Sequence, residues 1–197
     1  MSRITCQQCR RPLSACFCHR LTTVDNAWPV HILQHKKEAK HALGTAIIAQ
    51  LSLQHCQLLT AGNSPCEQQL ERLISEQQPL LIYPGNDSQP LSEVVGQTLR
   101  PLIFIDSTWR KSKRMLLESP QLQSLPKVSF KPAQPSRYQL RKAPNASARS
   151  TLEAIVTVLS ALEKDSEKYQ PLLATMDWMI QQQIEKMGEE TFARNYS

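Results

Sequence analysis

The sequence contains little glycine and no glycine-rich loop. Five glycines are spread over 197 residues. They do not form the Gly-x-Gly-x-x-Gly pattern that holds a dinucleotide at the turn between a strand and a helix. Neither a dinucleotide fold of that kind nor a typical methyltransferase loop therefore has a candidate in this chain.

Long hydrophobic runs are also missing. No apolar segment approaches the roughly 18–20 residues that a membrane-spanning helix needs, and Met1 to Cys6 lack the apolar core of a signal peptide. We therefore expect a cytoplasmic protein with no membrane contact, in which the six cysteines are thiols or metal ligands and not disulfides. The length fits one globular domain with a small appendage.

Four of the cysteines lie close together, with the spacing Cys6-x2-Cys9-x6-Cys16-x-Cys18. Paired thiolates on short loops are typical of tetrahedral zinc. Because four protein ligands leave no open coordination position, this site is expected to be structural. An iron–sulfur cluster would use the same ligands and stays an alternative. We assign residues 1–27 to this zinc knuckle and residues 28–197 to an α/β domain.

The net charge of +6 is concentrated in two blocks. Residues 1–41 hold seven Lys or Arg against two acids, and residues 100–149 hold eleven against two. Basic blocks separated by acidic ones are typical of a nucleic-acid surface assembled from two parts of a fold. Patchy charge without a nucleic-acid partner is the alternative. The predicted RNA contacts are Arg10, Arg11, Arg110, Lys111, Lys113, Arg114, Arg137, Tyr138, Arg141 and Lys142, with Tyr138 as the ring for one stacked base.

An apolar run ends at a single carboxylate near the middle of the chain. Leu102 to Ile105 read as a strand buried on both faces. Asp106 follows, and Ser107 and Thr108 then offer N-cap hydroxyls to a basic helix. Open α/β sheets bind ligands at the carboxyl ends of their strands, so Asp106 is the first candidate for a functional side chain. An aspartate that only caps the helix is the alternative.

Apolar periodicity predicts further strands and helices in alternation. This alternation predicts an α/β fold with a mostly parallel sheet and flanking helices. If the strands are parallel, Pro84 lies at the same sheet edge as Asp106. Ser150 and Glu153 are predicted to form a capping box. The expected strands cover residues 30–34, 56–61, 80–83, 102–105 and 127–130, and the expected helices include residues 40–53, 66–77 and 171–187.

Residues 106–109, Asp-Ser-Thr-Trp, resemble the Asp-x-Thr-Trp signature of the DTW-domain family. Other parts of the chain match the same family in the expected order. Lys36 stands where the family has proline, and Gly44-Thr45 stand where Asn-Thr is usual. The further matches are the four-cysteine spacing, His35 and Glu38 in its His-Pro-x-Glu element, Tyr138 to Lys142 in Tyr-x-Leu-Arg, and Thr151 with Glu153 in Ser/Thr-x-Glu.

The resemblance implies a SPOUT-like fold, in which the chain can be knotted, and an enzyme similar to tRNA-uridine aminocarboxypropyltransferases. Such an enzyme would move the 3-amino-3-carboxypropyl group of S-adenosylmethionine to N3 of a tRNA uridine and release methylthioadenosine. The variable loop is the first candidate for the position of that uridine, and the D-loop is the second. Asp106 is then the candidate base, with orientation of the cofactor as its alternative role, and Glu38 is the second catalytic candidate. The residues expected to hold the cofactor are Pro84, Ser107, Thr108, Trp109, Thr151 and Glu153.

Two other functions stay open at this point. An RNA methyltransferase would use the same cofactor but leave a smaller group on the nucleoside. A non-catalytic, zinc-containing RNA-binding module would bind tRNA without saturable affinity for S-adenosylmethionine. In each case the expected partner is tRNA, and no obligate protein partner is evident.

Overall fold

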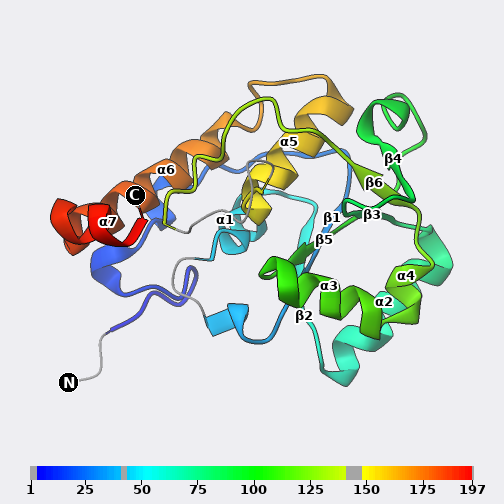
Figure 1. Cartoon of the computed structure of the whole chain (residues 1–197), viewed down its shortest axis with the longest axis horizontal. Helices are drawn as coiled ribbons and strands as arrows, with labels where there is room; N and C mark the ends of the chain where they lie inside the picture. The colour runs from blue at the N-terminus through cyan, green and yellow to red at the C-terminus, as the bar shows by residue number, and fades with distance from the viewer. Residues whose placement is uncertain (1–3, 41–43, 141–147, 197) are drawn as a thin grey trace.

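A computed structural model describes residues 4–40, 44–140 and 148–196. It contains a six-stranded, all-parallel β-sheet between two layers of helices (Figure 1). The strands are β1 (Val30–Gln34), β2 (Cys56–Thr60), β3 (Leu80–Ile82), β4 (Ser88–Pro90), β5 (Leu102–Asp106) and β6 (Lys127–Ser129). The helices are α1 (Ala46–Ser52), α2 (Ser64–Gln77), α3 (Trp109–Glu118), α4 (Pro120–Gln123), α5 (Thr151–Glu163), α6 (Gln170–Met187) and α7 (Glu189–Tyr196), with 3₁₀ turns η1 (Leu13–Ala15), η2 (Cys18–Arg20), η3 (Glu38–Lys40) and η4 (Leu91–Glu93).

The strand order places β5 inside the sheet, between β1 and β3. The full order is β2-β1-β5-β3-β6-β4. The chain leaves β1 toward β2 on one side and leaves β5 toward β6 on the other, so the direction of the crossovers reverses between β1 and β5. In open α/β sheets this reversal marks the place where ligands bind at the carboxyl ends of the strands. Gln34 and Asp106, which are register partners, end the two strands there.

Alternate residues of the central strands pack against opposite layers of helices, as expected for a sheet covered on both faces. Ile32 and Phe104 belong to the apolar cluster formed with α1, α5 and α6. Leu33 and Ile103 belong to the cluster formed with α2, α3 and α4 on the other face. Figure 1 shows these two groups of helices on opposite sides of the sheet. Because a slip of one residue would exchange the two faces, this packing sets the strand register and with it the place of Asp106.

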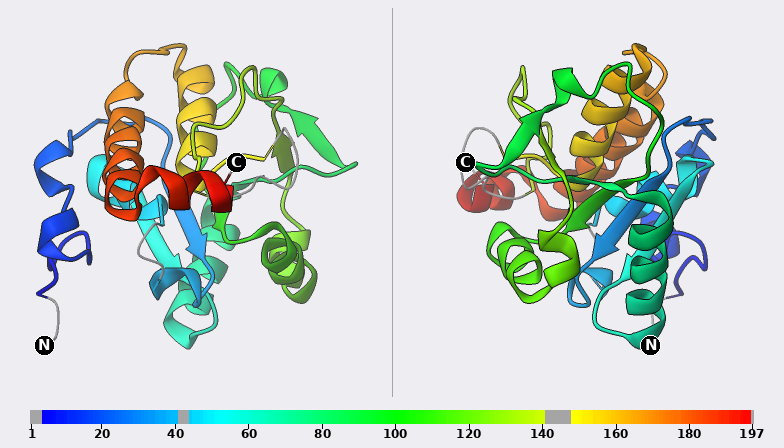
Figure 2. Two further views of the ribbon diagram at one scale, coloured as in Figure 1. Left: turned by 60° about the vertical axis from the view of Figure 1, so that its left-hand side comes forward. Right: turned by 90° about the vertical axis from the view of Figure 1, so that its right-hand side faces the viewer.

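The N-terminal segment lies along α6 (Figure 2). Thr175 Oγ1 of α6 donates to the carbonyl of Arg20 at 2.9 Å, and Lys186 Nζ donates to the carbonyl of Ser14 at 2.6 Å. Phe17 is fully buried in the same apolar cluster as Trp28 and the inward faces of α5 and α6. The cysteine-rich segment and the sheet therefore share one apolar core.

The helix predicted over residues 40–53 is shorter in the structure. Only η3 and α1 form there, and residues 41–43 lie outside the described part of the chain. Gly44 disfavours helix, and Thr45 Oγ1 accepts the backbone N–H of Leu152 at 3.4 Å, so α1 begins only at Ala46. β4 was not predicted, because Ser-Gln-Pro has no apolar alternation; it lies at the edge of the sheet, where proline is tolerated.

Two further expectations are only partly addressed by the described residues. None of their helices combines the length and the hydropathy needed to cross a bilayer. A knot stays a prediction, because residues 141–147 lie outside the described chain.

Glu163, the last residue of α5, holds the start of β1. Its carboxylate accepts the N–H of Ala27 at 2.9 Å and the ammonium of Lys168 at 2.6 Å, and its side chain is 9% exposed. Burial alone would raise the pKa of the Glu163 carboxyl, but these donors outweigh that effect, so its pKa lies below the usual value.

We predict that Glu163→Gln lowers the free energy of unfolding by about 2 kcal/mol at pH 7, because a neutral amide replaces a charged acceptor. The stabilisation is complete above the ordinary carboxyl pKa of 4.5 and is lost as the pH falls through the lower pKa of the folded protein. In urea unfolding the gap between wild type and variant should therefore be larger at pH 7 than at pH 3. Glu76→Gln, on the exposed face of α2, is the matched control. An equal gap at both pH values would contradict the role of the charge.

Candidate active site and metal centre

Asp106 ends β5 with its carboxylate held by two neighbouring elements. Gln34 Nε2, at the end of β1, donates to Oδ2 at 2.7 Å. Thr151 Oγ1, the first residue of α5, donates to Oδ1 at 2.5 Å. The residue is 9% exposed, and each carboxylate oxygen keeps a further lone pair. The carboxylate is thus fixed in place while it can still accept another hydrogen bond.

Helix α3 begins directly after this carboxylate with cations in its first turn. Thr108 is the N-cap, as predicted, and its Oγ1 accepts the N–H of Lys111 at 3.4 Å. Lys111 Nζ donates to Glu38 Oε1 at 2.6 Å, in a pair that is largely shielded from solvent. Arg110 is exposed. Glu38, from η3 after β1, therefore balances one of the two cations at the start of α3.

An aromatic pair lies at the same edge of the sheet. The ring centres of Trp109 and Tyr83 are 6.3 Å apart, with planes inclined by 59°. Trp109 is 40% exposed. Because β3 is parallel to β5, Pro84 lies at this edge, as predicted. The exposed indole can stack on a planar group, whether a nucleobase or the adenine of a cofactor.

Two polar residues at the end of β1 were missing from the predicted site. Gln34 reaches Asp106 from the adjacent strand, and the N–H of His35 donates to the carbonyl of Asp106 at 3.1 Å. Burial and the ammonium of Lys111 lower the pKa of His35, so its imidazole is neutral at pH 7. A polar residue that ends an apolar strand is the sequence signal that could have indicated Gln34.

Glu153 forms the predicted capping box at the start of α5. The Ser150 hydroxyl accepts the N–H of Glu153 at 3.3 Å, and Glu153 Oε2 accepts the N–H of Ser150 at 2.8 Å. The same carboxylate also accepts the Ser136 hydroxyl and the N–H of Arg137, the latter at 2.7 Å. Protein donors therefore occupy Glu153, so it holds the loop of residues 131–140 against α5. A direct contact of Glu153 with a cofactor stays a prediction, because three donors leave its carboxylate one further acceptor position.

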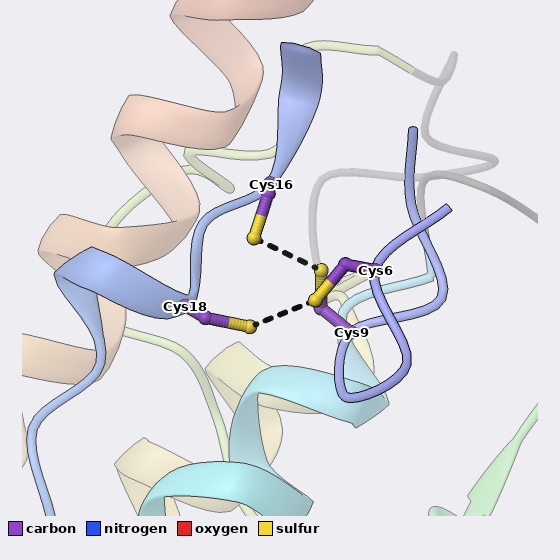
Figure 3. Close-up of side chains that lie close together, drawn as sticks. All are labelled: Cys6, Cys9, Cys16 and Cys18. Atoms are coloured by element: carbon purple, nitrogen blue, oxygen red, sulfur yellow. Dashed lines mark hydrogen bonds between the residues drawn. The ribbon is translucent and has the colours of Figure 1, made fainter. Parts of the chain in front are cut away.

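Four cysteine sulfurs converge near the N-terminus, and Figure 3 shows their side chains pointing toward one another. All four sulfurs lie within 4.8 Å of one another. Cys6 and Cys18 are 3.6 Å apart, and Cys9 and Cys16 are 3.7 Å apart. Sulfurs bound at about 2.3 Å to a tetrahedral zinc would be about 3.8 Å apart, so this set fits zinc with little movement.

The turn around Cys6 favours the thiolate form that a metal needs. Backbone N–H groups of Cys9 and Gln8 donate to the Cys6 sulfur and lower its pKa to about 6. Cys56 lies outside the cluster, and burial raises the pKa of its thiol to about 12. The spacing of the first four cysteines thus separates metal-ligand candidates from an inert thiol.

The exposed residues of the predicted RNA-binding set lie on the knuckle, on α3 and in the loop of residues 131–140. Arg114 pairs with Glu118 at 2.6 Å on α3, and Arg137 Nη1 donates to Asp177 Oδ2 of α6 at 3.0 Å. Tyr138 is partly buried against the main core. Arg141 and Lys142 lie outside the described residues. The other exposed members are Arg10, Arg110 and Lys113.

The burial of Arg11 contradicts its predicted contact with RNA. It is 4% exposed, and its guanidinium lies over the ring of Phe17 with Cζ 5.8 Å from the ring centre. The side chain is buried because the knuckle packs its apolar residues on the main core. In this arrangement Arg11 cannot reach an RNA backbone.

Comparison with known families matches residues 3–184 to the DTW domain. The chain belongs to the DTW-domain family. It is 32% identical over 203 residues to tRNA-uridine aminocarboxypropyltransferase 2 of Drosophila melanogaster, which aligns 98% of this chain with 80% of that protein. It is 27% identical to the protein of the same name from Mus musculus, covering 98% and 68% of the two chains, and 26% identical to tRNA-uridine aminocarboxypropyltransferase A of Arabidopsis thaliana, covering 88% and 78%. No solved structure matches this chain.

The three letters of the DTW signature have separate structural tasks in this member of the family. Asp106 accepts hydrogen bonds from β1 and α5. Thr108 caps α3. Trp109 stays exposed beside Tyr83. The signature therefore combines a fixed carboxylate, the start of a helix and an exposed ring within four residues.

We predict that this DTW-domain protein binds about one zinc ion per chain and that Cys9→Ser abolishes stable binding, because a tetrahedral site needs all four thiolates. Elemental analysis of the purified proteins measures the metal content. Cys56→Ser removes a thiol outside the cluster and should retain full zinc. Retention of zinc by Cys9→Ser would contradict the assigned ligand set.

We predict that Glu153→Gln loosens residues 131–140 and lowers the free energy of unfolding by roughly 1–3 kcal/mol, since charged acceptors are lost at Ser136 and Arg137. Glutamine can still complete a capping box, so α5 should still begin at Thr151. Hydrogen exchange resolved by peptide measures both regions. Glu93→Gln, at an exposed position, is the control, and unchanged exchange in residues 131–140 would contradict this role of Glu153.

Proposed function

We propose that this protein transfers the 3-amino-3-carboxypropyl group of S-adenosylmethionine to N3 of a uridine in tRNA, with the variable loop as the first candidate for the position of that uridine. The observation that carries the proposal is the buried carboxylate of Asp106, which Gln34 and Thr151 fix beside the cationic start of α3. Relatives named tRNA-uridine aminocarboxypropyltransferase, which align with nearly the whole chain, support it.

The reaction requires a base placed at the uridine. A bond forms between N3 and the carbon next to the sulfonium, the carbon–sulfur bond breaks, and methylthioadenosine leaves with the bonding electrons. The proton of N3 must leave during this step. Asp106 accepts it through a lone pair that neither Gln34 nor Thr151 occupies. The rest of the acceleration comes from alignment of nitrogen, carbon and sulfur.

The group to be transferred carries an ammonium and a carboxylate, and both charges have counterparts at this edge of the sheet. Glu38 offers negative charge to the ammonium. The N–H groups at the start of α3, together with Arg110, offer a site for the carboxylate. Binding the group at both charged ends selects the carbon that faces N3. Pro84, Ser107, Thr108, Trp109 and Thr151 line the same edge and are assigned to the cofactor, with Glu153 acting through the loop it holds.

The tRNA backbone is assigned to lysines and arginines of the knuckle, of α3 and of the segment from Arg137 to Lys142. Neutralising several phosphates makes binding strongly dependent on salt. Tyr138 is kept as a candidate for stacking on a base. The four-thiolate metal centre leaves no open coordination position and is assigned a structural role. The proposed phosphate contacts are Arg10, Arg110, Lys111, Lys113, Arg114, Arg137, Arg141 and Lys142.

We predict that Asp106→Asn lowers the rate of modification by about 10²–10⁴-fold, because an amide cannot accept the N3 proton. In the assay, unmodified tRNA is incubated with the protein and S-adenosylmethionine and then digested to nucleosides. Mass spectrometry measures the masses of these nucleosides. Asp25→Asn is the control, since its side chain is 73% exposed and lies before β1, at the other end of the strands.

The same experiment separates the remaining alternatives. If Asp106 is the base, the variant keeps its affinity for S-adenosylmethionine, and if it orients the cofactor, that affinity falls with the rate. A normal rate would remove Asp106 from the chemistry. A nucleoside heavier by one methyl group would indicate a methyltransferase. Binding of tRNA with neither product nor saturable cofactor binding would indicate an RNA-binding module.

A further inference from the structure

A buried arginine lies beside the metal centre without partners for two of its nitrogen atoms. Nε and Nη1 of Arg11 are buried and have no hydrogen-bond partner among the described residues. The ring of Phe17 covers the guanidinium and offers no hydrogen-bond acceptor. An arginine stays charged in proteins, and a buried charge without a partner is strongly destabilising. The position therefore requires a negative partner close by.

The cysteine sulfurs are the groups that suit this requirement. Arg11 follows Cys9 by two residues, and its carbonyl accepts the N–H of Cys6 at 2.7 Å, so it is part of the turn that presents the first two cysteines. Cys9 lies in the same apolar cluster as Phe17, over whose ring the Arg11 guanidinium lies, and Cys16 packs against that cluster. Four thiolates around one Zn²⁺ leave two negative charges, and metal-bound sulfurs accept hydrogen bonds from neighbouring donors.

Tyr138 brings a second part of the chain to the packing around the knuckle. It packs against the same apolar cluster that contains Cys9 and Phe17, the residue whose ring lies under the Arg11 guanidinium. Tyr138 belongs to the loop of residues 131–140, which Glu153 holds through Ser136 and Arg137. Glu153 is two residues from Thr151, the partner of Asp106. The loop of residues 131–140 thus packs on the core beside the knuckle through Tyr138 and is bonded to the first turn of α5, where Thr151 holds Asp106.

We propose that Arg11 is a positioning residue that neutralises the zinc–thiolate centre and joins it to the loop at Tyr138, so that metal binding sets the position of this loop. Arg11 acts on the metal centre and does not contact RNA. Only the use of the loop by tRNA rests on the proposed function. The link between metal, Arg11 and loop stands without it.

The first test measures zinc affinity by competition with a chromophoric chelator. Arg11→Met keeps the length of the side chain but removes its charge and its donors, and Arg11→Lys keeps the charge. We expect Arg11→Met to weaken zinc binding about 10–100-fold, as removal of groups that support metal ligands does, and Arg11→Lys to recover part of that loss. Arg10→Met, at the exposed neighbouring position, should leave zinc affinity unchanged. Wild-type affinity in Arg11→Met would overturn the proposal.

The second test follows hydrogen exchange in the zinc-saturated proteins. Arg11→Met should speed exchange in residues 131–140 and leave α3 unchanged. Wild-type exchange in that loop would overturn the link to the loop. If Arg11→Met does not fold, Arg11→Lys takes its place, with a smaller expected change in both measurements. Neither test uses tRNA or S-adenosylmethionine, so a failure here is separate from a failure of the proposed reaction.

Discussion

The hydrogen bonds that Gln34 and Thr151 donate to Asp106 are the interactions on which the candidate active site depends. They join the ends of β1 and β5 to the start of α5. The parallel register places Gln34 opposite Asp106, and that register holds because each face of the sheet has its own layer of apolar side chains. The site is therefore a direct product of how the sheet is packed.

The first turn of α5 serves both structure and site. Ser150 and Glu153 cap the helix, Thr151 reaches Asp106, and Glu153 also holds the loop of residues 131–140. A capping role and a role in the site are thus compatible for this turn. The same loop carries Tyr138, which packs against the apolar cluster that contains Cys9 and Phe17 of the knuckle.

Local patterns predicted much of the fold. The apolar run of residues 102–105 predicted the strand that ends at Asp106. Thr108 and the capping box of Ser150 and Glu153 predicted where α3 and α5 begin, because a helix cap involves residues only three positions apart. β4 was missed because Ser-Gln-Pro has no apolar alternation and the strand forms only by pairing with β6. Arg11 was misplaced for a related reason, since a charged residue carries no local sign that a distant helix layer will bury it.

The sequence alone determined the four-cysteine set, the buried strand and the carboxylate at its end, because each depends on residues that are near one another along the chain. Only the tertiary structure decided which partners meet. Asp106 bonds to Gln34, which is 72 residues away along the chain, and to Thr151, which is 45 residues away. Glu38 pairs with Lys111, which is 73 residues away. Periodicity describes which face of an element is apolar, but it does not say which element that face will contact. The order of the strands supplies that information, and it forms only when the whole sheet is assembled.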